Sequence, residues 1–173
     1  MKYFLLPFFF IFLFFINSVN SEQNIAFINM DKVISTSNAG SSILKQLTDL
    51  NNKNLQFLKN EEKKFKKKET KLISQKNIIS EADFQNKVNE LKSEIKNYNQ
   101  NRDKMINEFN KLKVDNTNNL LKLINPILLK FSDDKEISIV LQKKDLVVAK
   151  TELDITEEII EIVNKEVKEI KIK

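Results

Sequence analysis

The chain contains no cysteine, no histidine and no tryptophan, and it has one glycine and two prolines among 173 residues. Without thiol or imidazole groups it cannot build a zinc site of the common type, a thiol nucleophile or an imidazole base. A single glycine cannot form a phosphate-binding loop or a dinucleotide-binding turn. Because no disulfide can form, stability must come from packing or from assembly with other chains. We therefore expect a protein that is not an enzyme and that binds no metal or cofactor.

Residues 1–21 differ from the rest of the chain. Lys2 precedes an apolar run over residues 3–16, and small and polar residues follow as far as Ser21. This order is typical of a cleaved secretory signal peptide, and Val19 and Ser21 would occupy the −3 and −1 positions, so we place cleavage after Ser21. An uncleaved membrane anchor is the alternative, although a spanning helix needs about 20 apolar residues. The first interpretation predicts export from the cytoplasm.

The remaining chain has three parts. Residues 24–30 are short and β-prone, which predicts a strand. Residues 38–131 contain almost no helix breakers and predict long helices, with a kink at Pro126. Residues 137–142 and 146–151 flank Lys143-Lys144-Asp145 and predict a β-hairpin. A last helix should follow, with Asp154 or Thr156 as its cap and an apolar face made of Ile159, Ile160, Val163 and Val167.

Heptad spacing is the sharpest pattern in the helical part. One series of residues recurs in steps of four and three with a single polar member: Phe84, Val88, Leu91, Ile95, Tyr98, Arg102, Met105, Phe109 and Leu112. A second series lies upstream and thins to one apolar residue per heptad: Ile43, Leu47, Leu50, Leu58, Phe65, Leu72 and Ile79. Two such series predict two helices that pack as a coiled coil, well at the start of the first helix and poorly further out.

A helix restart separates the two series. Ser80 and Asp83 form a capping box, so one helix ends just before Ser80 and another begins there. The two helices should fold back as an antiparallel hairpin, the arm, over residues 37–131 with its tip near residues 79–83. Each helix of about 40–50 residues would extend roughly 60–75 Å.

The predicted strands all lie at the root of this arm. Residues 22–36 and 132–173 should therefore form a small β-containing body, and the fold class is α+β. A body of this size buries too little apolar surface to be stable alone, and its strand edges can pair with another chain, so we expect an oligomer. The residues expected in the shared core are Ile25, Phe27, Ile28, Ile139, Leu141, Val147 and Ala149.

Positive charge is concentrated in the arm. Residues 37–79 contain ten lysines and four acidic residues, while the whole chain carries a net charge of +5. The lysine-rich run is either a solvated helix face or a binding surface, and nucleic acid is an unsuitable partner for an exported chain. The remaining partners are anionic lipid, lipopolysaccharide or acidic unfolded polypeptide. The expected contact residues are Phe57, Lys63, Lys64, Phe65, Lys66, Lys67, Lys68, Lys71 and Leu72.

Several segments together resemble the Skp (OmpH-like) family of periplasmic chaperones. The first is residues 25–34, followed by Asn38-Ala39-Gly40 and Lys45-Gln46-Leu47. The predicted hairpin over residues 139–149, the Asp154-Ile155-Thr156 helix start and the restart at residues 80–85 are also similar to that family. The likeness spans nearly the whole chain after the signal peptide, although residues 165–173 run past the expected end.

The resemblance implies a periplasmic homotrimer. Three bodies would form a small β-barrel, and three arms would surround a cavity that holds unfolded outer-membrane β-barrel proteins without ATP. Lipopolysaccharide or an anionic membrane surface is a further expected partner. The alternative function is an exported coiled-coil spacer or tether of the cell envelope, for which the arm would be a static rod.

Overall fold

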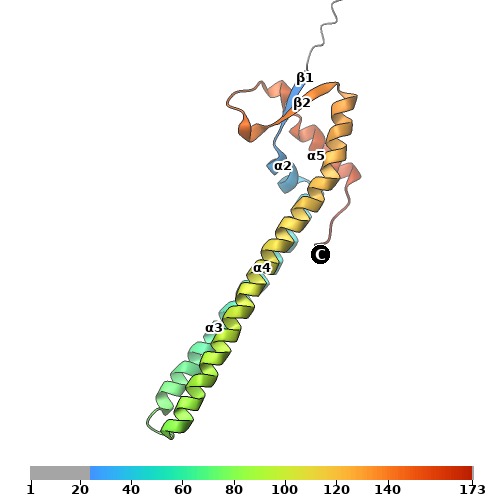
Figure 1. Ribbon diagram of the computed structural model, residues 1–173. Helices are drawn as coiled ribbons and strands as arrows, with labels where there is room; N and C mark the ends of the chain where they lie inside the picture. Colours follow the sequence, from blue (N-terminus) through green and yellow to red (C-terminus); the bar gives the residue numbers. More distant parts are fainter. Residues whose placement is uncertain (1–23, 173) are drawn as a thin grey trace, which may run out of the picture.

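A long two-helix arm projects from a small body that holds both strands and the remaining helices (Figure 1). The computed structural model describes residues 24–172, and the predicted signal peptide lies outside the described residues. Among the described residues, no helix combines the length and the apolar character needed to cross a bilayer. The α+β fold with a helical arm, predicted from the sequence, is confirmed.

Two strands form the sheet of the body. β1 (Asn24–Ile28) and β2 (Ile137–Gln142) pair in parallel, with Phe27 opposite Leu141. Parallel strands need a long connection, and here the whole arm is that connection. The sheet therefore brings the two ends of the arm together.

The predicted hairpin after β2 is wrong. The chain turns through the 3₁₀ helix η2 (Lys143–Asp145), and residues 146–150 form an irregular arch before η3 (Thr151–Leu153). The free edge of β1 is taken instead by the chain just after η3, where the Ile155 N–H donates to the Phe27 carbonyl at 3.0 Å. Residues 146–151 are β-prone, but no strand of residues 24–172 pairs with them.

A short helix that the sequence pattern did not reveal joins β1 to the arm. α2 (Met30–Thr36) is capped by Asn29, whose side chain accepts a hydrogen bond from the Lys32 N–H at 3.0 Å. Ser37 then caps the first helix of the arm by accepting from the Gly40 N–H at 3.2 Å. Two caps only eight residues apart produce a sharp change of direction between the strand and the arm.

The arm consists of α3 (Asn38–Gln75) and α4 (Glu81–Asp134). Ser80 caps α4 by accepting from the Asp83 N–H at 3.1 Å, as the capping box predicted. α4 continues unbroken through Pro126, and its last turns lean away from the axis of the arm, which agrees with the predicted kink (Figure 1).

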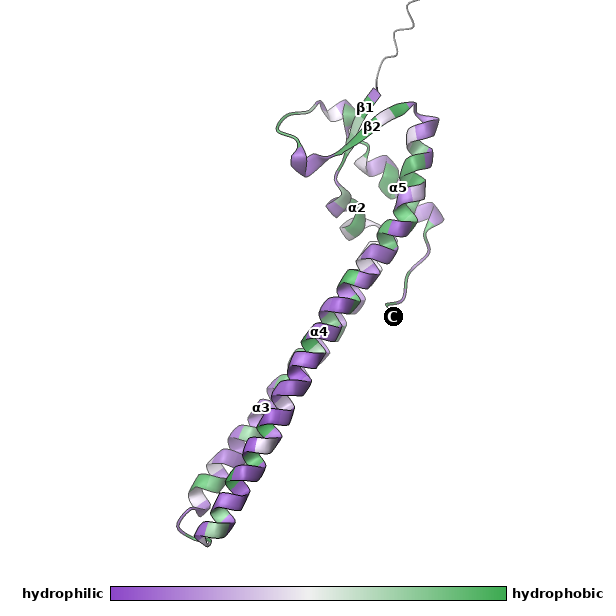
Figure 2. Cartoon of the chain, viewed as in Figure 1, coloured by the Kyte–Doolittle hydropathy of each residue, from purple (hydrophilic) through white to green (hydrophobic). Residues whose placement is uncertain are grey.

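The hydrophobic core lies in the body and the root of the arm. The buried members from the arm are Ala39, Ile43, Leu47, Leu120, Ile124 and Ile127. Beyond Leu47, no described residue of α3 is buried. In Figure 2 most of the ribbon of the arm carries the colour of hydrophilic residues, with hydrophobic residues at intervals between them. The prediction that the first helix packs well only near its start is confirmed.

The last helix, α5 (Thr156–Glu166), covers the core with Ile159, Ile160 and Val163. The predicted cap is wrong by position, because the N-cap residue is Ile155 and its side chain makes no capping bond. The Asp154 carboxylate still accepts from the Thr156 N–H at 3.1 Å. Asp154 also pairs with Lys143 at 2.8 Å.

Candidate functional site

The surface of the arm between its two helices is the strongest candidate site. The predicted heptad positions do face one another, but those of α3 beyond Leu47 and those of α4 remain partly accessible; Leu58, Phe65 and Leu72 of α3 are half-buried, as are Leu91 and most of the α4 series. A bundle of only two helices cannot cover both flanks of its own interface. Apolar side chains are therefore accessible along the length of the arm.

One aromatic contact fixes the spacing of the helices at mid-arm. The rings of Phe65 and Tyr98 meet edge to face with 5.3 Å between centroids. The Tyr98 hydroxyl donates to Glu62 at 3.1 Å. Burial raises the pKa of Tyr98, and the hydrogen bond to Glu62 raises that pKa further. The phenol thus stays protonated and keeps this donor over the physiological range.

One flank of the arm is an apolar groove of about 640 Å³. Its floor and walls come from both helices: Phe65, Leu72, Ile73, Phe84, Val88, Leu91, Ile95 and Tyr98. Ile73 is 64% exposed and Ile95 is 38% exposed, so their side chains stand open to solvent. Lys66, Lys92 and Arg102 lie on the rim together with Glu62 and Glu69. This apolar groove can accept apolar side chains of a partner, and its rim carries both positive and negative charges.

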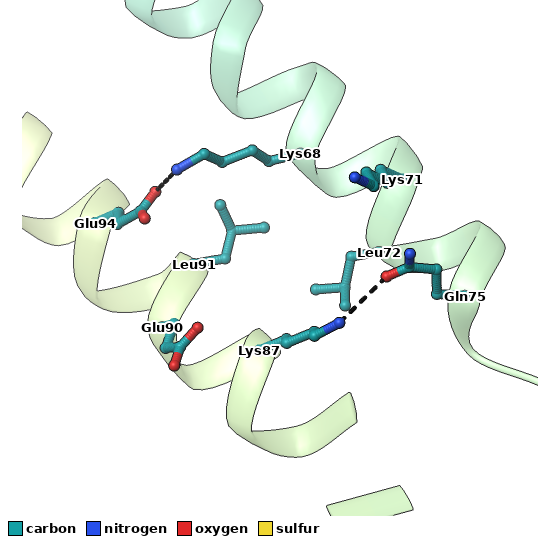
Figure 3. Close-up of a pocket in the computed structure, with 8 residues that line it drawn as sticks. All are labelled: Lys68, Lys71, Leu72, Gln75, Lys87, Glu90, Leu91 and Glu94. Carbon is teal, nitrogen blue, oxygen red and sulfur yellow. Dashed lines mark hydrogen bonds and ion pairs between the residues drawn. The ribbon is translucent and has the colours of Figure 1, made fainter. Parts of the chain in front are cut away.

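The opposite flank, which we call the polar flank, is bridged by one ion pair and one hydrogen bond between the helices. Lys68 reaches across to Glu94 at 2.5 Å above Leu72 and Leu91, and Lys87 donates to Gln75 at 3.5 Å (Figure 3). Figure 3 also shows Lys71 and Glu90 bordering the same small hollow of about 290 Å³. Further toward the root, Lys64 pairs with Glu61 at 2.6 Å on this flank. The two flanks of the arm therefore differ in chemistry.

The structure divides the contact residues that the sequence predicted. Phe65 and Leu72 lie between the helices and touch both flanks. Lys64, Lys68, Lys71 and the half-exposed Phe57 line the polar flank, and Lys66 alone among the predicted lysines lies on the rim of the apolar groove. Lys63 and Lys67 line neither flank, because they are two residues from Phe65 and point away from α4.

Ile73 and Ile95 are groove residues that the sequence analysis did not single out as contacts. Ile73 follows a heptad position and Ile95 occupies one, so heptad spacing alone does not distinguish either of them as a contact residue. The signal for a second accessible face is that an apolar residue, Ile73, directly follows the heptad residue Leu72.

The residues predicted for a shared core fall into two groups. Phe27 and Ile28 are buried inside the single chain. Exposed members are Ile25, Ile139, Leu141, Val147 and Ala149, and Val147 is fully exposed on the arch. The Lys143 ammonium lies 5.6 Å from the centre of the Phe27 ring, which holds the start of the arch against the sheet. The arch thus presents its apolar residues outward.

The acidic side chains are spread out over residues 24–172. No group of three or more acidic side chains gathers there in a way that could hold a metal ion. Some acidic residues of the arm form ion pairs, such as Lys111–Asp115 at 2.5 Å. The arm offers a surface that can bind a partner through apolar contact and charge.

Comparison with known proteins agrees with this geometry. The family model for outer membrane protein (OmpH-like) matches residues 24–163. The chain belongs to this OmpH-like family. A crystal structure of an OmpH-like protein from Caulobacter crescentus CB15, described as a candidate outer membrane chaperone, superimposes with a TM-score of 0.80. The alignment covers 87% of this chain and 89% of that one, at 12% identity, so it shows a shared fold. A search of curated protein sequences finds no significant match.

Proposed function

We propose that this OmpH-like protein is an ATP-independent periplasmic holdase chaperone that sequesters unfolded outer-membrane β-barrel proteins. Membership of the OmpH-like family and the described chaperone role of the Caulobacter protein with the same fold support a chaperone. The signal-like residues 1–21 support a site of action outside the cytoplasm.

The apolar groove on the arm is the observation that carries this proposal. Strands of an outer-membrane barrel alternate apolar and polar residues and aggregate when they are unpaired. An extended client segment can place apolar side chains against Ile73 and Ile95 while its polar side chains face water. Each such contact is weak, so many contacts along the arm hold the client and no single residue is essential.

The positive charges support this function by attraction over distance. Lys66, Lys92 and Arg102 on the groove rim would draw in acidic clients. Lipopolysaccharide and anionic membrane surfaces carry the same sign of charge as those clients. We therefore include them as further partners of the lysine-rich α3.

Assembly into a homotrimer is the second part of the proposal. The body exposes Ile25, Ile139 and Leu141 along its sheet, and Val147 on the arch is fully exposed. Unpartnered apolar residues on two neighbouring segments favour a contact with another copy of the body. Three arms then surround one client, which a single arm cannot enclose.

Suppression of aggregation tests the holdase function. Urea-unfolded outer-membrane barrels of unrelated sequence are diluted into buffer with the mature chain, and light scattering is followed. We expect suppression for several clients, and a double variant Ile73→Glu/Ile95→Glu to raise the client dissociation constant about tenfold or more, since each tenfold step corresponds to about 1.4 kcal/mol.

Ile106→Glu is the matched control, because Ile106 is 46% exposed on α4 but does not line the apolar groove. If Ile106→Glu weakened client binding as much as the double variant does, the apolar groove would not be the client-binding surface. Failure to suppress aggregation of any unfolded barrel would favour the spacer or tether function.

A further inference from the structure

Residues 167–172 leave α5 and run beside the first turns of α3 in the direction of the arm. Figure 1 shows this last segment descending from the body to end next to the arm. The match to the OmpH-like family model ends at residue 163, so the segment lies outside the part of the chain that this model matches. Neither the chaperone function nor the heptad packing of the arm accounts for it.

The side chain of Gln46 binds the backbone of this segment at two points. Its Nε2 donates to the Ile170 carbonyl at 2.8 Å, and its Oε1 accepts from the Ile172 N–H at 3.3 Å. A peptide group of a neighbouring β-strand would bond in the same way, with one donor and one acceptor. Ser42 holds the amide in place, because Nε2 also lies 3.2 Å from the Ser42 carbonyl and hydroxyl oxygens.

Apolar contacts reinforce these hydrogen bonds. Val167, Ile170 and Ile172 are partly buried against the core cluster of the body. Their neighbours Lys168 and Lys171 are exposed. The segment is therefore anchored by three apolar residues, and the residues between them are exposed to solvent.

A third attachment ties the end of α5 to the start of α3. The Asn38 N–H, one of the amides at the beginning of α3, donates to the Asn164 Oδ1 at 2.7 Å. Elsewhere α3 packs mainly on α2 and α4, and α5 packs mainly on the same two helices. Asn164 and residues 167–172 are thus the link between α5 and α3.

We propose that residues 167–172 form a strap that fixes the direction of the arm relative to the body. α3 has 38 residues and therefore extends about 57 Å from its root at about 1.5 Å per residue. A rotation of about 10° at the root would displace the tip by about 10 Å over that length. A contact near the root consequently controls how far the tips of arms can spread. The proposal concerns arm direction and does not depend on what the arm binds.

Single-molecule energy transfer between tip and body tests the strap. The chain has no cysteine, so the changes Asn77→Cys in the turn of the arm and Lys144→Cys in η2 provide two unique dye positions, both exposed. Labelled chains are mixed with an excess of unlabelled chains, so that each assembly reports one tip-to-body distance.

Two variants remove the strap by different routes. A chain shortened after Glu166 lacks the segment, and Gln46→Leu keeps it but removes both of its hydrogen bonds. The matched control is Gln56→Leu, an identical change at an exposed position of the same helix. Circular dichroism and sedimentation check that helix content and association are unchanged.

We expect the shortened chain and Gln46→Leu each to broaden the distribution of tip-to-body distances, and Gln56→Leu to leave it unchanged. A distribution that stays as narrow in Gln46→Leu as in the unaltered chain overturns the proposal, and so does equal broadening in Gln56→Leu. Should the shortened chain fail to fold, Gln46→Leu decides alone, because it retains the apolar contacts of the segment.

Discussion

Gly40 lies directly against the carbonyl oxygen of Ile34, and a Cβ atom added at Gly40 would be 1.6 Å from that oxygen. The only glycine of the chain thus lets the first turn of α3 pack onto the end of α2. We predict that Gly40→Ala destabilises the protein by about 3 kcal/mol, because the two backbones must separate. Urea unfolding followed by circular dichroism measures this change.

The sign of that effect is diagnostic. At an ordinary helix position, replacing glycine by alanine stabilises by about 1 kcal/mol. Stabilisation by Gly40→Ala would mean that α2 and α3 do not approach as described. Ser41→Ala, one residue further and exposed, is the control and removes only a hydrogen bond to the Ser35 carbonyl.

Lys66 offers a test of the charged groove rim. Lys66→Glu should slow association with an acidic unfolded client by about threefold to tenfold at low ionic strength, because rim charges act chiefly on the association rate. Lys67→Glu makes the same change in net charge at a position that lines neither flank. Stopped-flow measurement of the association rate at two salt concentrations compares the two variants, since salt screens the attraction between the rim charges and the client. Identical rates for both variants would show that only the total charge of the arm matters.

Asp154 makes the stability of the body depend on pH. Burial, the largest single influence, raises the pKa of this carboxyl, but the hydrogen bonds from Lys143 and Thr156 outweigh it and hold the pKa below the ordinary value of 3.8. A carboxyl with a lowered folded-state pKa stabilises the fold above the unfolded pKa and loses that contribution as the pH falls through the folded pKa. We therefore expect the contribution to be complete at pH 7 and to decline progressively as the pH falls below about 4 and through the lowered folded-state pKa.

Asp154→Asn measures this contribution. The variant should lose roughly 1–2 kcal/mol at pH 7, as for hydrogen bonds to a charged group, and should match the unaltered chain more closely at pH 3. Asp145→Asn, in the exposed η2 turn, is the control. An equal loss for Asp154→Asn at both pH values would show that packing, and not charge, accounts for the effect. Urea unfolding at the two pH values provides both numbers.

Local signals in the sequence were enough to predict the arm. Ser80 and Asp83 are neighbours in the chain, so their capping box could be recognised without tertiary information, and the heptad series around Tyr98 identified the packed positions. The apolar groove could not be predicted in the same way. Heptad spacing shows which residues face the other helix, but which flank stays open depends on residues such as Ile73 and Lys68 brought together from both helices.

The body was harder to predict because its elements are short and depend on distant partners. α2 has seven residues, too few to show a helical period. Residues 146–151 have β-prone composition, but a strand forms only where an edge is free to pair, and Ile155 already bonds to Phe27. Local preference was therefore overridden by the pairing of residues more than 100 positions apart.

The arch provides the final prediction, which concerns assembly. Val147 is fully exposed in the single chain, so Val147→Asp should leave its folding unchanged. In a homotrimer that buries the arch, an unpaired carboxylate would cost several kcal/mol, and the concentration needed for assembly should rise at least about tenfold. Sedimentation velocity over a dilution series measures this shift.

Ile78→Asp is the matched control, since Ile78 is 79% exposed in the turn at the far end of the arm. It should sediment as the unaltered chain does. Assembly that is insensitive to Val147→Asp would place the contact between copies elsewhere on the body, whereas dissociation by Ile78→Asp would place it at the tips of the arms. A mature chain that sediments as a monomer at every concentration would contradict the trimer itself. The exposed apolar residues of the arch and the sheet would then have no partner in another copy.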